Sequence, residues 1–264
     1  MDVLETLMLV SGGLAAGTLG GMLGIGGGIA LMPLLRFVVG LSPAVAAGTC
    51  AAAVFFTTLG GSYRHYRLGH LDIRSVVPII IAGATTTGVF SLFFLTLARR
   101  GHWLDLGIGL VFCLISLRMI AEGTRRAGRD RGAETGGSEV TGSLPHKIGI
   151  GAAAGVLPGL LGIGTGGVLV PAFTFLLKTP IRTAMAASLL CFCFNALISS
   201  AFKLAQGFMD VGVALPICLG TLLGANLGAV LNRRFSLRKL KLLFGLVFGL
   251  ISLRFICSFI EGTT

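Results

Sequence analysis

Two glycine-rich runs contain the residues of this chain best suited to binding chemistry. The first reads LGIGGGIALMP from Leu23 to Pro33, and the second reads LGIGTGGVLVP from Leu161 to Pro171. Both interrupt long apolar stretches, so each predicts a membrane helix that breaks at its glycines. Glycine adopts positive φ angles and lets N–H groups approach a ligand closely. A helix that begins after the break adds unpaired donors and partial positive charge. The pattern predicts an anion site where the two breaks meet.

The candidate anion-binding residues are therefore the glycines of both runs and the threonine inserted in the second. They are Gly24, Gly26, Gly27, Gly28, Gly162, Gly164, Thr165, Gly166 and Gly167. The alternative is that glycines only let helices pack closely. That alternative suits the glycines spaced at four residues, namely Gly13, Gly17 and Gly21, Gly151, Gly155 and Gly159, and Gly220, Gly224 and Gly228. It suits the clustered glycines less well, because adjacent glycines weaken a helix more than packing requires.

Polar residues follow each broken stretch inside otherwise apolar segments. Thr49 in the first half, and Ser188 and Asn195 in the second, are the candidates to line the path of the anion. Asn195 is the best single candidate, because a buried amide in a membrane needs hydrogen-bond partners. For Thr49 and Ser188 the alternative is a hydroxyl that bonds to a backbone carbonyl of the preceding turn.

Other chemistry has little support in the residue pattern. The ten carboxylates fall in predicted loops or near helix ends, and the six cysteines lie in apolar runs without a CxxC. No paired carboxylates, HExxH or buried Ser/His pair is present, so we expect no enzyme, catalytic residue, metal or cofactor. Residues 162–167 also match G-x-G-x-x-G, but no preceding strand supports a dinucleotide site. Arg36, in the first broken stretch, is interpreted as an interfacial anchor, with attraction of an anion as the alternative.

The composition is that of a polytopic membrane protein. Of the 264 residues, 54% are hydrophobic and 12% are charged, with a mean hydropathy of +0.93. A soluble domain would carry about twice that charged fraction. The net charge of +11 comes mostly from basic residues in short loops, which favours a positive-inside bias over nucleic-acid binding. The partners that we expect are the lipid bilayer, a small anion and, through the spaced glycine faces, a second copy of the chain.

The chain contains two related halves. GLVFCLISLR at 109–118 returns as GLVFGLISLR at 245–254. We expect an N-terminal membrane repeat over 1–121, a polar cytoplasmic linker over 122–147 and a C-terminal membrane repeat over 148–264. Each repeat predicts a broken stretch followed by three helices, all without strand periodicity. The stretches are 4–40 and 147–177, and the helices are 44–62, 75–97, 103–121, 183–202, 211–231 and 241–260.

The basic loops favour broken stretches that leave and return on one side of the membrane. On that reading most basic residues lie inside, and the 203–210 loop with Lys203 lies outside. A single crossing would instead turn the basic cluster after residue 231 outward. Each half then holds a re-entrant hairpin and three spans, so the halves are inverted relative to each other. The expected fold is all-α, with two inverted repeats and about eight to ten hydrophobic segments. Because the arm over 147–161 would be about 22 Å long, its tip would lie within the bilayer.

The paired motifs resemble those of the TauE/SafE family of membrane transporters. The resemblance rests on the two glycine runs and on HYRLGHLD at 65–72 and KLAQGFMD at 203–210, and it covers essentially the whole chain. It implies a carrier of the bacterial inner membrane for sulfite, organosulfonates or related sulfur oxyanions. We expect alternating access with the anion held at the glycine tips. An anion channel and a structural membrane subunit without transport activity remain the alternatives.

Overall fold

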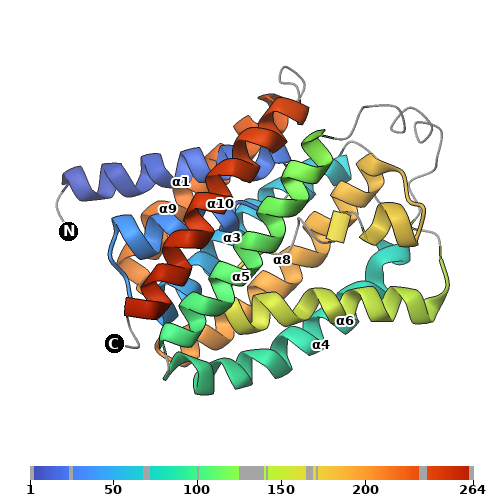
Figure 1. Cartoon of the computed structure of the whole chain (residues 1–264). Helices are drawn as coiled ribbons and strands as arrows, with labels where there is room; N and C mark the ends of the chain where they lie inside the picture. The colour runs from blue at the N-terminus through green and yellow to red at the C-terminus, as the bar shows by residue number, and fades with distance from the viewer. Residues whose placement is uncertain are drawn as a thin grey trace.

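The structure, a computed structural model, describes residues 3–23, 26–67, 72–99, 101–124, 140, 142–164, 169–170, 172–231 and 237–261, and these contain helices but no strand. Eight helices within this part are long and apolar enough to cross a membrane, which confirms the all-α polytopic fold (Figure 1). They are α1 (Val3–Leu23), α3 (Pro43–Arg67), α4 (Ile73–Ala98), α5 (Gly101–Thr124), α6 (Leu144–Leu161), α8 (Ile181–Ala205), α9 (Val211–Leu231) and α10 (Leu237–Glu261). Shorter elements follow α1 and α6, namely α2 (Gly28–Pro33) and the π-helical turns η1 (Leu34–Val38) and η3 (Ala172–Leu176).

The first half opens with a hairpin that breaks at the predicted glycines. The α-helical pattern of α2 changes to the π-helical turn η1 after Pro33, which has no N–H for the helical ladder. A methyl group added at Gly20 would overlap Gly27, and one added at Gly12 would lie 2.9 Å from the Leu34 side chain. The α2–η1 segment therefore runs back along α1.

The second half opens with a longer arm than the sequence indicated. Helix α6 begins at Leu144 and has 18 residues, about 27 Å at 1.5 Å per residue, so the expected length of about 22 Å was too short. The helix ends at Leu161, and Gly162 is its C-cap. At the other end, a methyl group added at Gly142 would lie 2.6 Å from Leu177, so the chain after the break returns to the end where α6 begins.

The spaced glycines join helices of different halves. Gly17 of α1 lies against Thr221 of α9, and Gly155 of α6 lies against Gly83 of α4, each so closely that an added methyl group would overlap the backbone. The other spaced glycines of these helices make equally close contacts in the same order, so the two helices of each pair run parallel. Small residues allow the two backbones to approach this closely. The glycine faces that we expected to serve a second copy are covered within the chain instead.

Corresponding helices of the two halves run antiparallel. The Ser116 hydroxyl of α5 donates to the Gly245 carbonyl of α10 over 2.6 Å, and the Ser252 hydroxyl donates to the Gly109 carbonyl over 2.8 Å. These reciprocal bonds join residues that occupy matching positions in the repeat. Helices α3 and α8 are also antiparallel, because Gly48 lies near Lys203 and Gly61 near Leu189. Figure 1 shows α5 and α10 side by side in front of them.

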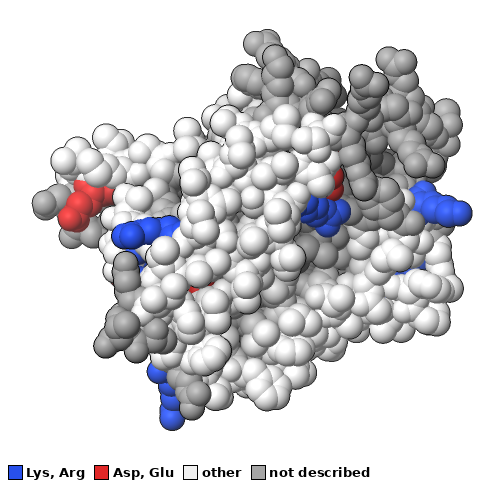
Figure 2. Space-filling model, in the orientation of Figure 1, with Lys and Arg blue, Asp and Glu red and all other residues white. Residues whose placement is uncertain are grey.

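The outer face of the bundle is apolar, as contact with lipid requires. On α9, Leu215, Leu219, Leu223 and Leu227 form a stripe that is 52–61% exposed, whereas the glycines of the same helix face α1. Charged residues are few on the face that Figure 2 displays. The interior holds small and polar residues as well as large apolar side chains.

Candidate functional site

The described parts of the two glycine tips contact each other. A methyl group added at Gly28 would lie 3.1 Å from the amide nitrogen of Gly164 and 2.5 Å from the Val54 side chain of α3. Gly26, Gly27 and Gly164 are buried as well. Breaks that lie far apart in the chain therefore meet, as the two glycine runs predicted.

Positive φ angles shape the first tip. Gly26 has φ 78° and Gly27 has φ 72°, which residues with a side chain rarely adopt. Gly27 is the N-cap of α2, and its carbonyl accepts hydrogen bonds of 3.1 Å from the N–H groups of Ala30 and Leu31. The N–H groups of Gly28 and Ile29 precede the first helical acceptor, so the helix itself offers them no partner.

The second tip begins at the left-handed residue that caps α6. Gly162 has φ 66°, and its N–H donates to the Pro158 carbonyl over 3.1 Å. A methyl group at this position would overlap the carbonyl oxygen of Ala47 in α3. Glycine is thus required here both by the backbone angle and by the close approach of α3.

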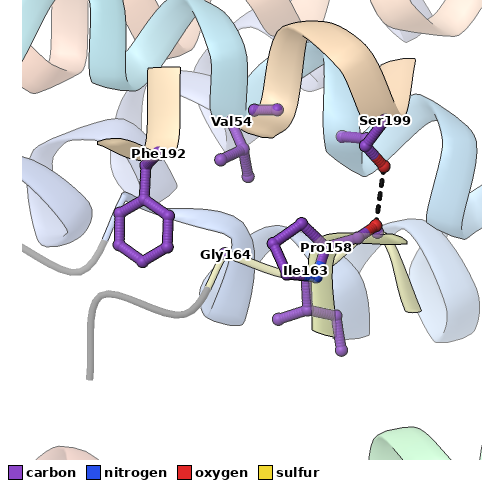
Figure 3. Close-up of a pocket in the computed structure, with 9 residues that line it drawn as sticks. Val54, Pro158, Ile163, Gly164, Phe192 and Ser199 are labelled. Atoms are coloured by element: carbon purple, nitrogen blue, oxygen red, sulfur yellow. Dashed lines mark hydrogen bonds between the residues drawn. The ribbon is translucent and has the colours of Figure 1, made fainter. Parts of the chain in front are cut away.

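A small cavity lies beside the second tip, between α3, α6 and α8 (Figure 3). Its volume is about 10 Å³, room for about one water molecule. Its walls are Ala51, Val54, Pro158, Gly162, Ile163, Gly164, Phe192, Ala196 and Ser199. An anion as large as sulfite enters this cavity only if the surrounding helices move.

Several of the predicted site residues do not line the cavity. The residues that lie outside the described part of the chain are Gly24, Thr165, Gly166 and Gly167. Thr49 is buried and accepts a 3.3 Å hydrogen bond from the backbone N–H of Asp210. Ser188 donates to the Met185 carbonyl over 3.1 Å, which is the backbone-bonded alternative. Neither side chain lines the cavity.

Asn195 is buried without a hydrogen-bond partner among the described residues. It is 1% exposed, and both its amide nitrogen and its amide oxygen lack a partner there. A methyl group at Gly83 of α4 would lie 2.9 Å from the Asn195 oxygen. Although Asn195 is not in the wall of the cavity, its neighbour Ala196 is. An unpaired buried amide is costly and calls for a ligand, water or moving partner.

Lys203 is the residue that the sequence pattern missed. The expected outside loop over 203–210 is wrong at this position, because α8 continues to Ala205 and Lys203 is fully buried. Its Nζ donates to the carbonyls of Pro158 and Gly159 over 3.1 and 3.0 Å and to the Ser199 hydroxyl over 2.7 Å. No local feature of the sequence distinguished it from a lysine at the membrane surface.

Arg36 belongs to a buried ion pair and is neither a free anchor nor a free attractor of anions. Its guanidinium donates to the two carboxylate oxygens of Asp105 over 3.1 and 2.9 Å. The Ser258 hydroxyl donates to the same carboxylate over 3.0 Å. Asp105 lies near the start of α5, as expected for a carboxylate, yet its side chain is only 2% exposed. The pair joins η1 to α5 and α10.

Paired broken helices inside an apolar bundle are typical of membrane transport proteins. Within that class, this chain belongs to the sulfite exporter TauE/SafE family, whose model matches residues 9–255. It is a multi-pass membrane protein of a transporter family, not an enzyme.

Curated relatives carry names of the same kind. Over 264 aligned residues, 26% are identical to the probable membrane transporter protein YunE of Bacillus subtilis, covering 95% of this chain and 97% of that one. A probable membrane transporter protein of Xylella fastidiosa is 33% identical, with coverage of 91% and 89%. The sulfite exporter TauE/SafE family protein 1 of Arabidopsis thaliana is 30% identical over 44% of this chain and 26% of its own length. No solved structure matches the chain.

Proposed function

We propose that the chain is a carrier of the bacterial inner membrane that moves small anions of the sulfite and organosulfonate class. The anion binds at the glycine tips, where backbone amides and helix N-termini face it. The observation that carries this proposal is the contact between Gly28 of the first tip and Gly164 of the second. The family name and the names of the relatives support the choice of sulfur oxyanions.

Alternating access follows from the arrangement that we propose for the halves. The antiparallel pairing of α5 with α10 supports two inverted repeats, 1–121 and 148–264, joined by a cytoplasmic linker over 122–147. In inverted repeats the two halves exchange conformations, which opens a central site to each side in turn. The cavity beside Gly164 is too small for such an anion, so the site must change shape to admit one, as alternating access requires.

Anion flux into liposomes tests this function. Purified protein is reconstituted, and uptake of sulfite, sulfoacetate, acetate and chloride is measured against protein-free liposomes. The proposal predicts saturable uptake of sulfite or sulfoacetate. Uptake that rises linearly with concentration would indicate a channel, and no uptake above the protein-free control would reject anion transport.

Asn195→Leu separates a functional amide from a structural one. Because the amide has no partner among the described residues, its removal should leave the unfolding temperature unchanged or raised. If the amide contacts the anion, transport should fall by roughly tenfold or more, the equivalent of one lost hydrogen bond. Asn226→Leu is the control, since Asn226 is exposed and bonds to the Leu222 carbonyl over 2.9 Å. Equal transport by both variants would remove Asn195 from the path.

A further inference from the structure

Lys203 is a buried cation without a counter-charge in the described part of the chain. The ion pairs found there are Arg36–Asp105 and Arg118–Glu122, and neither includes Lys203. Its surroundings are neutral: two carbonyls, one hydroxyl and the ring of Phe94, whose centroid lies 4.4 Å from Nζ. A charge inside a membrane protein is costly unless it is paired, and such residues are commonly functional.

The hydrogen bonds of this lysine suit its charged, ammonium form. Carbonyl oxygens of Pro158 and Gly159 accept but cannot donate. The Ser199 hydroxyl donates its own hydrogen to the Pro158 carbonyl over 2.6 Å, so it too accepts from Lys203. Three acceptors require three N–H donors on Nζ, which only the ammonium form supplies.

The Nζ of Lys203 lies directly behind the second glycine tip. It donates to carbonyls of the last turn of α6, just before that tip. Gly164 of the second tip in turn contacts Gly28 of the first. Ser199, which bonds to Lys203, lines the cavity beside Gly164 (Figure 3). One hydrogen bond therefore separates the buried charge from the candidate site.

We propose that Lys203 is the cation that binds the transported oxyanion. When the site opens, an anion oxygen replaces the carbonyls of Pro158 and Gly159 as the acceptor of the ammonium. The inference rests on the proposed function and adds what the tip amides alone do not supply, a full positive charge at the site. It makes the site selective for anions over neutral solutes of the same shape. Anion binding would also free the end of α6, because the ammonium would no longer hold the carbonyls of Pro158 and Gly159.

Lys203→Met provides the first test, with sulfite as the probe. Methionine keeps an unbranched side chain, and an apolar substitute for a buried charge is often tolerated. We expect sulfite affinity in detergent to fall roughly ten- to hundredfold, the range for a hydrogen bond to a charged group. Lys178→Met is the matched control, because Lys178 is exposed, and it should bind like the unaltered protein. Unchanged affinity in folded Lys203→Met would overturn the role of Lys203 while leaving the carrier intact.

A second measurement does not depend on the neutral variant folding. The chain has five lysines, so replacing the other four with arginine leaves one side-chain amine signal in the NMR spectrum of nitrogen-labelled protein. The proposal predicts that this signal shifts on titration with sulfite and saturates at the measured affinity. A signal that stays in place while sulfite binds would overturn the proposal. If the unaltered protein neither binds nor transports any anion of the panel, the proposed function fails instead.

Discussion

Gly162→Ala is expected to abolish anion transport while leaving the protein in the membrane. Alanine at φ 66° is strained by about 1–2 kcal/mol, and its methyl group would overlap the Ala47 carbonyl of α3. The second tip must then move away from α3, and with it Gly164, which contacts the first tip. A displacement of about 1 Å at a binding site can lower a rate by roughly a hundredfold. Saturable uptake of sulfite by reconstituted variant measures the effect.

Gly207→Ala is the matched control for this prediction. Gly207 has φ 77°, so alanine there is strained in the same way, but a methyl group would meet nothing within 4 Å. Transport by this variant should stay close to that of the unaltered protein. If both variants transport equally well, the close packing of the tip against α3 does not matter for function.

Asp105→Asn is expected to have the largest effect on stability. The change removes the charge that pairs with Arg36, whose side chain is only 22% exposed. Leaving a buried charge without its partner costs about 3–5 kcal/mol. Because Arg36 is partly exposed, we expect the free energy of unfolding to fall by about 3 kcal/mol. The loss should appear as a lower midpoint of unfolding in detergent.

The second ion pair of the described residues provides the comparison. Arg118 and Glu122 are one helical turn apart, and each side chain is 31% exposed. Glu122→Gln should therefore change stability by about 0.5 kcal/mol or less. Similar losses in Asp105→Asn and Glu122→Gln would contradict a buried, structural role for the Arg36 pair.

Helices and breaks were predictable because both have strong local signals. Apolar runs between polar loops locate the long helices, and adjacent glycines locate the ends of α1 and α6. The repeat of the glycine runs also predicted that the two tips meet. Here local preference and tertiary structure agree.

Lys203 and the Arg36–Asp105 pair were not predictable in the same way. Charged residues near predicted helix ends usually reach the membrane surface, and nothing local distinguishes one that is buried. Their burial depends on partners far away in sequence, such as Pro158 for Lys203. The spaced glycines pose the same difficulty, since their pattern does not say whether the facing helix belongs to this chain or to another copy.

The most direct test of the central claim is an experimental structure of the protein with a bound organosulfonate. We expect the sulfonate between the two glycine tips, within hydrogen-bond distance of the backbone amides of Gly28 and Gly164. A sulfonate bound elsewhere, with those amides turned away from it, would contradict the account.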